Sequence, residues 1–260
     1  MGNELKFIEL AKSFARDSEL NRYEINGREV VLFDEPIAAI GDAHDLLFDK
    51  LSDPDIDGPH MIHPTEWLPD AESVISFFFP CTETLRQSMY PPGPEVSLEW
   101  LYGRYEGGKK FLPALCHELE ALAESLNIKA CAPDIDPRYK VVNKLANWSE
   151  RHAGFISGLG SFGLHRMLIT EKGCAGWVIN ILVNEKYPVT KRKYEKLYEY
   201  CTGCYQCIPR CPVGAINEER MDKSACGRFN DAVKELHMPR NGCSKCGLTV
   251  PCETGIPARS

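Results

Sequence analysis

The chain has 260 residues, of which 43% are hydrophobic, and a formal net charge of −7 at pH 7. This length is enough for one sizeable domain and a small second one. The sequence has no apolar run close to the roughly 18 residues that a membrane-spanning helix requires. Its acidic balance also argues against a broad nucleic-acid-binding surface, which is normally basic.

The first half of the chain predicts alternating helices and strands. Apolar residues recur at a helical period over residues 4–16, and residues 42–51 predict a second helix. Strands are predicted at residues 30–33 and 73–79, where the second apolar run is continuous and ends at Pro80. Two further helices, at residues 96–105 and 110–126, follow a proline-rich turn and precede a buried strand at residues 128–131.

The following segment predicts a helix and then a pair of strands. The helix covers residues 141–156, and strands at 166–170 and 177–183 are connected by the turn Glu171-Lys172-Gly173. This mixture predicts an α+β class with an α/β-type layered sandwich. A boundary near Tyr187-Pro188 divides the chain into a body, residues 1–188, and a C-terminal module, residues 189–260.

The C-terminal module is rich in cysteine. Eight of the twelve cysteines of the chain fall between residues 201 and 252, and four of them form a C-x2-C-x2-C-x3-C-P run that starts at Cys201. In this run three thiolates bind one cubane cluster and the fourth binds a second cluster. Two [4Fe–4S] clusters need eight thiolates, the number available here.

The eight cysteines divide into two sets by analogy with two-cluster ferredoxins. Pro251 precedes Cys252 instead of following it, which departs from the usual pattern of the last ligand. The first cluster is assigned Cys201, Cys204, Cys207 and Cys252, and the second cluster Cys211, Cys226, Cys243 and Cys246.

Zinc is the alternative for these thiolates. Eight cysteines can hold two tetrahedral zinc ions, but the tight run is poor zinc spacing. Residues 1–20 lack the apolar stretch of an export signal, so we expect a cytoplasmic protein. Thiols stay reduced there, which argues against disulfides.

A glycine-rich segment precedes the module. Gly158, Gly160 and Gly163 form a G-x-G-x-x-G pattern. A dinucleotide-binding motif of this form follows a strand and opens a helix, whereas here it follows a predicted helix and leads into a strand. Two interpretations remain open: a helix C-cap and turn, because glycine accepts positive φ, or close approach of the backbone to a bulky planar ligand.

The glycine segment, the cysteine run, the single Cys226 and the late Cys243-x2-Cys246 pair together resemble epoxyqueuosine reductases and the related reductive dehalogenases. In that family a nitroreductase-like body binds cobalamin beside a ferredoxin-like module with two cubane clusters. The resemblance implies no histidine ligand to cobalt, so His152 and His165 are expected to be structural or surface residues. It also implies that the corrin lies against Gly158, Leu159, Gly160, Ser161, Phe162, Gly163, Gly173, Cys174 and Ala175.

The family's catalytic aspartate has no counterpart at the expected position. It stands six residues before a Glu-Arg pair, and counting back from Glu150 leads to Lys144. A lysine can donate a proton when burial or a neighbouring charge lowers its pKa. Lys144 is therefore the candidate catalytic residue, with an exposed helix lysine as the alternative and Tyr102 and Tyr105 as other candidate donors.

The resemblance implies an oxidoreductase. Electrons would come from a ferredoxin or flavodoxin, pass through the two [4Fe–4S] clusters and reach a cobalamin that reduces a small organic substrate. Family members that act on tRNA carry a further helical-repeat domain, and this sequence ends eight residues after Cys252, so tRNA is expected to be an unlikely partner. The alternatives are an electron-transfer protein that activates the corrinoid of another protein, and an FMN-dependent iron–sulfur reductase.

Overall fold

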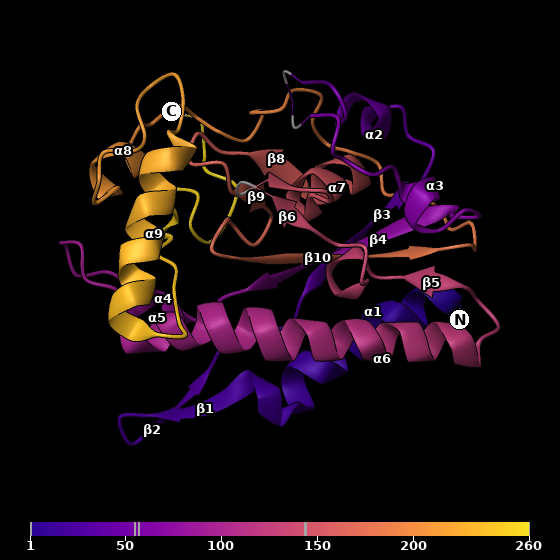
Figure 1. The fold of residues 1–260 in the computed structure, drawn as a ribbon, viewed down its shortest axis with the longest axis horizontal. Coiled ribbons are helices and arrows are strands. Elements are labelled where there is room, and N and C mark those ends of the chain that lie inside the picture. Colours follow the sequence, from indigo (N-terminus) through magenta and orange to yellow (C-terminus); the bar gives the residue numbers. More distant parts are fainter. Residues whose placement is uncertain (1, 55, 57, 143–144, 260) are drawn as a thin grey trace.

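The computed structural model describes residues 2–54, 56, 58–142 and 145–259. At its centre lies a four-stranded antiparallel sheet in the order β3-β4-β10-β5 (Figure 1). The strands are β3 (Ile37–Asp42), β4 (Ser73–Pro80), β10 (Gly176–Val183) and β5 (Ala130–Cys131). The sheet confirms the mixed helix-and-strand class and the strands predicted at residues 73–79 and 177–183.

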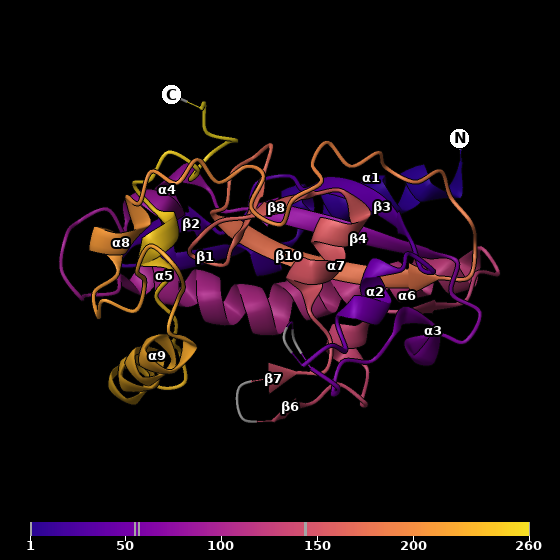
Figure 2. The ribbon, with the colours of Figure 1, turned by 90° about the horizontal axis from the view of Figure 1, so that it is seen from above.

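Strand β4 is buried along its whole length because helices cover both faces of the sheet. Alternate residues point to opposite faces, so Ile75 and Phe77 pack in one core and Val74 and Phe78 in the other. Helices α1 (Asn3–Asp17) and α6 (Leu112–Ser125) pack in the first core. Helix α7 (Glu150–Ser157) and the short helices α2 (Leu47–Lys50) and α3 (Pro64–Trp67) contribute to the second core (Figure 2). The continuous apolar run of β4 is thus explained.

Helix α6 continues a longer helical segment. The residues predicted as two helices, 96–105 and 110–126, form α5 (Leu98–Tyr102), a π-helix η2 (Gly103–Phe111) and α6 without a break. Gly107 lies in η2, and a Cβ atom there would stand 2.6 Å from the ring of Phe33. Glycine therefore allows the widened helix to lie close to the core, and π-helical segments are frequent at functional sites.

Two sequence predictions are wrong. Residues 141–156 do not form one helix: β6 (Val141–Val142) pairs with β7 (Leu145–Ala146), and α7 begins only at Glu150. The side chain of Asn147 closes this hairpin, accepting from Lys140 N at 2.9 Å and donating to Arg138 O at 2.9 Å. Residues 42–51 are mostly the end of β3 and a turn, with only α2 helical.

The predicted pairing of residues 166–170 with 177–183 is also wrong. β9 (Leu168–Thr170) pairs with β8 (Gly160–Phe162), whereas β10 pairs with β4 and β5. The physical reason is burial: β10 has Ile179 and Ile181 in one core and Leu182 in the other, so it belongs between covered strands.

The remaining elements are short or belong to the C-terminal module. They are η1 (Glu19–Asn21), β1 (Arg22–Ile25), β2 (Arg28–Val31), α4 (Glu83–Gln87), η3 (Pro133–Ile135), α8 (Cys207–Arg210), α9 (Lys223–His237) and η4 (Lys245–Gly247).

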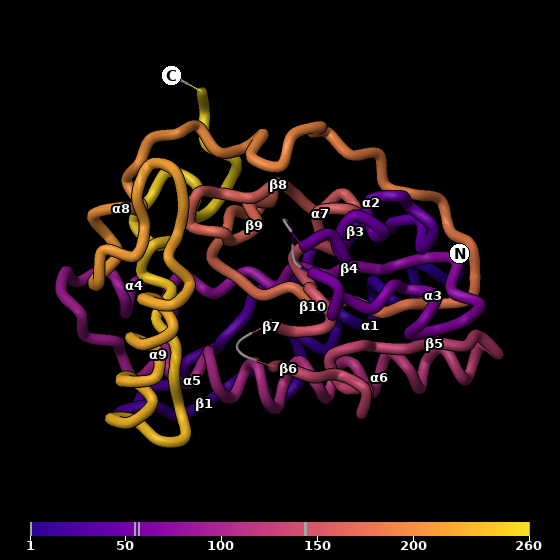
Figure 3. The backbone as a smooth tube through the Cα atoms, turned by 45° about the horizontal axis from the view of Figure 1, so that its top comes forward, coloured from indigo at the N-terminus to yellow at the C-terminus, as the bar shows by residue number. Residues whose placement is uncertain are grey.

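The chain after β10 returns across the body before it forms the module. Residues 184–200 pass over the side covered by α7, where Thr190 N donates to Ile40 O at 2.8 Å and Tyr194 Oη donates to Phe155 O at 2.6 Å (Figure 3). Helices α8 and α9 then lie at one end of the sandwich (Figure 1).

Ion pairs with two buried carboxylates join the module to the body. Arg240 Nε donates to Glu106 Oε2 at 3.0 Å, and Arg86 Nη1 lies 2.7 Å from Glu253 Oε1. Both carboxylates are buried, so each needs its cationic partner in place.

The division into two domains and the nitroreductase-like character of the body stay predictions. No helix formed by the described residues is long and apolar enough to cross a membrane.

Candidate functional site

The four cysteines assigned to the first cluster line one small pocket. Cys201, Cys204, Cys207 and Cys252 surround it together with apolar side chains such as Ile169. Burial raises the pKa of Cys207 to about 11, and the nearby charges of Cys252, Cys201 and Cys204 raise it further. Four sulfur atoms around an apolar hollow are the donor set that a cubane cluster requires.

The four cysteines assigned to the second cluster also lie together. Burial raises the pKa of Cys246, and the charges of Cys243, Cys226 and Cys211 act in the same direction. Backbone N–H groups point at two of these sulfurs, from Ala215 to Cys211 Sγ at 3.2 Å and from Lys245 to Cys243 Sγ at 3.5 Å. Such hydrogen bonds favour thiolates and tune bound clusters, so these residues too fit a cluster. The ligand roles themselves stay predictions.

A cavity of about 340 Å³ lies between the body and the module. The body contributes Trp100, Trp177 and Phe78 to its wall, and the module contributes three second-cluster cysteines, Cys226, Cys243 and Cys246. A mostly apolar wall with a few polar groups, at this volume, is typical of a small-molecule site.

Arg104, in η2, brings a positive charge to this cavity. Its guanidinium lies 5.0 Å from the centre of the Trp177 ring, and its buried Nε atom has no hydrogen-bond partner among the described residues. Burial lowers the pKa of Arg104, as does the charge of Arg151, which also lines the cavity. A buried donor without a partner is unfavourable, so the cavity is suited to a ligand that offers a hydrogen-bond acceptor.

A pair of carboxyl groups lies at the cavity, one of them in its wall. Glu150, at the start of α7, lines the cavity and shares a hydrogen bond with Asp134 in η3. Burial raises the pKa of Asp134 well above its usual value, and the charge of Glu150 adds to this shift. The pair therefore retains a proton at pH values where an isolated carboxyl group has lost it. The sequence places Asp134 in a proline-rich loop from which it could reach a site, but it carries no local signal that Glu150 is its partner.

The residues predicted to contact the corrin do not all line one cavity. Cys174 and Ala175 line the cavity, whereas Gly158 and Leu159 line a separate depression of about 150 Å³. Their binding roles stay predictions, as do those of the residues that line neither: Gly160, Ser161, Phe162, Gly163 and Gly173.

Backbone conformation and close contacts within the protein explain why glycine occupies three positions of this segment and the following turn. Gly158 is the C-cap of α7 with φ of 102°, which confirms the C-cap interpretation. A Cβ atom on Gly160 would stand 2.0 Å from Ile169 O, and one on Gly173 would stand 2.1 Å from Glu253 O.

The other candidates have different outcomes. Lys144 lies outside the described residues. Tyr102 and Tyr105 are absent from the described cavity wall, and the Tyr102 ring instead contacts the Arg240 guanidinium at 3.9 Å.

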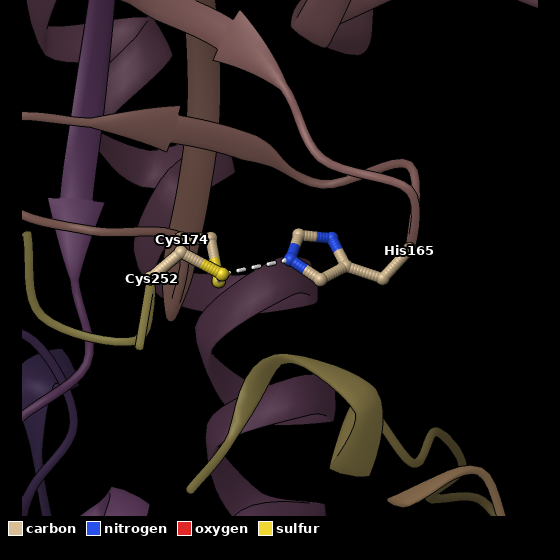
Figure 4. A group of neighbouring side chains, drawn as sticks. All are labelled: His165, Cys174 and Cys252. Carbon is tan, nitrogen blue, oxygen red and sulfur yellow. Dashed lines mark hydrogen bonds between the residues drawn. The ribbon is translucent and has the colours of Figure 1, made fainter. Parts of the chain in front are cut away.

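His165 was expected to be structural or on the surface, and it is buried next to a predicted ligand. Its Nε2 atom lies 3.3 Å from Cys252 Sγ, and Cys174 Sγ lies 3.9 Å from the same sulfur (Figure 4). These contacts lower the pKa of Cys252, with the hydrogen bond from Cys174 as the largest cause. Sequence reasoning missed this contact because the residues are far apart in the chain.

Comparison with known proteins supports the iron–sulfur interpretation. Residues 194–217, which include the cysteine run from Cys201 to Cys211, match the 4Fe-4S binding domain family. An epoxyqueuosine reductase of Bacillus cereus is 25% identical over 216 residues, which are 78% of this chain and 53% of the relative. The chain thus spans about half the length of this curated relative.

Solved structures of the same kind have a similar fold. An epoxyqueuosine reductase in complex with an epoxyqueuosine-modified stem loop of tRNA-Tyr has a TM-score of 0.58 at 18% identity, over 98% of this chain and 66% of that one. The catabolic reductive dehalogenase NpRdhA has a TM-score of 0.55 at 14% identity, over 85% of this chain and 30% of that one.

The tRNA-bound structure overturns the expectation that tRNA is an unlikely partner, because a protein of similar fold was solved with a tRNA stem loop. The comparisons confirm the resemblance seen in the sequence: the chain has the fold of epoxyqueuosine reductases and reductive dehalogenases, and it contains a 4Fe-4S binding segment.

Proposed function

We propose that the protein is an iron–sulfur oxidoreductase that passes electrons through two [4Fe–4S] clusters to a corrinoid bound in the cavity between body and module. The observation that carries this proposal is the shared wall: Cys226, Cys243 and Cys246 line the same cavity as Trp100 and Trp177. A ligand there lies against the second cluster. The electron donor is a ferredoxin or flavodoxin.

The chemistry of the wall fits a planar macrocycle with polar side arms. Trp100 and Trp177 offer apolar surface to a flat ring, while the partnerless Nε of Arg104 and the side chain of Asn230 offer groups for polar arms. When bound, the corrinoid supplies a cobalt centre that can reduce an organic substrate, and cubane clusters reach potentials as low as about −700 mV.

The Glu150–Asp134 pair holds a proton beside this cavity. A reduction that cleaves or saturates a bond at carbon or oxygen consumes protons as well as electrons. A proton held at the cavity wall can be donated to the substrate in that step. We assign Glu150 as the group that contacts the substrate and Asp134 as the residue that positions it.

The substrate class is a modified nucleoside carried by a tRNA stem loop, as in the relative of similar fold. Cationic residues beside the cavity support this choice. Arg166, Arg220 and Lys223 line a depression that adjoins the cavity at Met221, which belongs to both walls. Arginine and lysine at such a rim contact nucleic-acid phosphates.

The first experiment is anaerobic purification with added cobalamin, followed by an absorbance spectrum and iron, cobalt and zinc analysis. About eight irons and one cobalt per chain are expected, because two cubanes contain eight irons. Cys204→Ser should lower the iron content toward four, whereas Cys116→Ser, in the core of the body, should leave it unchanged. Eight irons with a flavin spectrum and no cobalt would favour the FMN alternative, and zinc without iron would overturn the proposal.

A second experiment tests the substrate class. Binding of a tRNA stem loop should weaken as salt rises from about 50 to 200 mM, because phosphate contacts release counterions. Arg220→Ala should reduce both affinity and salt dependence, while Lys50→Ala, an exposed lysine of α2, should change neither. Binding that is insensitive to Arg220 and to salt would remove tRNA from the proposal.

A further inference from the structure

The surroundings of Cys252 separate the first-cluster pocket from the cavity. Cys252 and His165 are both buried, and the His165 ring lines both hollows at once. Its Nε2 atom faces Cys252 Sγ at 3.3 Å (Figure 4). Any group held by Cys252 therefore has the imidazole as its neighbour on the cavity side.

The backbone determines which ring nitrogen carries the proton. Met167 N–H donates to His165 Nδ1 at 3.1 Å, so Nδ1 must offer its lone pair. In a neutral imidazole the proton then sits on Nε2, and Nε2–H points at the Cys252 sulfur.

The same tautomer argues against a metal ion held by His165. The ligand atoms of His165, Cys174 and Cys252 lie within 4.8 Å of one another, a geometry that three metal ligands can have. A metal-bound histidine normally donates a hydrogen bond from its other nitrogen. Here the other nitrogen accepts one, so the imidazole is a donor to sulfur and not a metal ligand.

Backbone contacts hold the partner sulfur in place. Cys174 N donates to Cys252 O at 2.9 Å, and Ala175 N donates to Glu253 O at 3.3 Å. The turn at Gly173 thus binds the Cys252 segment directly to the start of β10, and the distance between His165 and Cys252 does not depend on flexible side chains alone.

We propose that His165 is a positioning residue that donates a hydrogen bond to the Cys252 thiolate and thereby raises the reduction potential of the first cluster. Reduction adds negative charge that spreads onto the sulfur ligands, and an N–H donor stabilises that charge. The inference depends on the proposed assignment of Cys252 to the first cluster. It does not require the corrinoid.

The test compares His165→Leu, His165→Gln and the wild-type protein in a reductive titration followed by electron paramagnetic resonance. His165→Leu removes the donor, and one of the two clusters should become harder to reduce by about tenfold in its equilibrium constant, which is about 59 mV for a one-electron couple. His165→Gln retains an amide N–H and should shift less. His117→Leu, on the exposed side of α6, is the control and should shift neither cluster.

Iron content separates the possible outcomes. The inference requires both His165 variants to retain about eight irons, the content of two cubanes. Unchanged potentials in fully loaded His165→Leu overturn the hydrogen-bond role alone. Loss of about four irons in both variants shows that His165 is a ligand, which also overturns it. A wild-type protein without iron would instead refute the cluster assignment in the proposed function.

Discussion

Arg104 combines a positive charge with a buried, unsatisfied donor atom in one side chain. Its Nε atom has no partner among the described residues, while its guanidinium stacks over Trp177 and faces the cavity. A protein retains such a group only if something gained on ligand binding offsets its unfavourable desolvation. Arg104 is therefore a stronger indicator of a bound ligand than the G-x-G-x-x-G segment that the sequence analysis singled out.

We expect Arg104→Gln to weaken binding of the cavity ligand by about 2 kcal/mol, roughly 30-fold, since hydrogen bonds to charged groups contribute about 1.5–3 kcal/mol. The unliganded variant should be no less stable than the wild type, because it loses a buried donor that has no hydrogen-bond partner among the described residues. Cobalamin titration and urea unfolding measure the two effects, with the exposed Arg28→Gln as control. Equal affinity in both variants would contradict the assignment.

Asp134 makes stability depend on pH. Its folded-state pKa is raised, chiefly by burial and then by Glu150. Above the unfolded pKa of about 3.9 the unfolded chain loses this proton first, so stability falls as pH rises until the folded pKa is passed. Asp134→Asn should remove this decline and be more stable at neutral pH, by about 1.4 kcal/mol for each unit of pKa difference.

Urea unfolding of Asp134→Asn at several pH values between 4 and 8 checks this prediction. The exposed Asp17→Asn in α1 should follow the wild-type curve. A variant at Asp134 with the same pH dependence as the wild type would show that the carboxyl pair does not share a proton.

At the scale of elements, the turn between β9 and β10 connects the body to a predicted cluster ligand. Gly173 has φ of 81°, and the backbone of Glu253 occupies the place where its Cβ would be. Both features require glycine, the first because L-residues rarely adopt positive φ and the second because backbone atoms cannot move aside cheaply.

Gly173→Ala should therefore destabilise the protein by more than the roughly 1 kcal/mol that positive φ alone costs, and should lower the iron content by displacing Cys252. Gly27→Ala is a matched control, because Gly27 has φ of 73° and nothing within 4 Å of its Cβ position. Thermal unfolding and iron analysis of both variants give the comparison. Equal losses in the two would mean that contact with Glu253 is unimportant.

The π-helix η2 is the second element that builds the site. It continues α5 into α6 and carries Arg104 and Glu106, which contact the cavity and the module respectively. One widened helical segment thus positions both a candidate ligand-binding cation and an anchor for Arg240.

At the scale of the whole molecule, body and module differ in what holds them together. The body has two packed cores on either side of its sheet. The module has the 15-residue helix α9 and the short elements α8 and η4. Cys207 and Cys252 belong to a small core that also includes Ile169 and Cys174 of the body. A region of this kind depends on bound metal for much of its folding free energy.

Removal of the proposed clusters should therefore unfold the module and leave the body folded. We expect an iron chelator with oxidant to expose the eight cysteines between 201 and 252 to alkylation, while the sheet signal in circular dichroism persists. Anaerobic return of iron and sulfide should reverse the change. One cooperative loss of all structure would instead indicate that the module is required by the body.

The sequence by itself determined the iron–sulfur binding segment and the most buried elements. The spacing of Cys201, Cys204, Cys207 and Cys211 is local, and a cluster constrains local spacing directly. The apolar run of β4 and the helical period of α1 are local signals as well. Both predictions are confirmed. A strand buried on both faces, such as β4, and a helix buried on one face, such as α1, each leave an apolar pattern within a few residues.

Only the tertiary structure decided which distant groups meet. The contact of His165 with Cys252, 87 positions apart, joins residues whose neighbours in the chain carry no trace of the partner. Arg104, Glu150 and three of the second-cluster cysteines reach one cavity because the chain crosses back over the sheet after β10 and places the module against the end of the sandwich. The site therefore depends on sheet order and chain return, which are non-local properties set by packing the whole molecule.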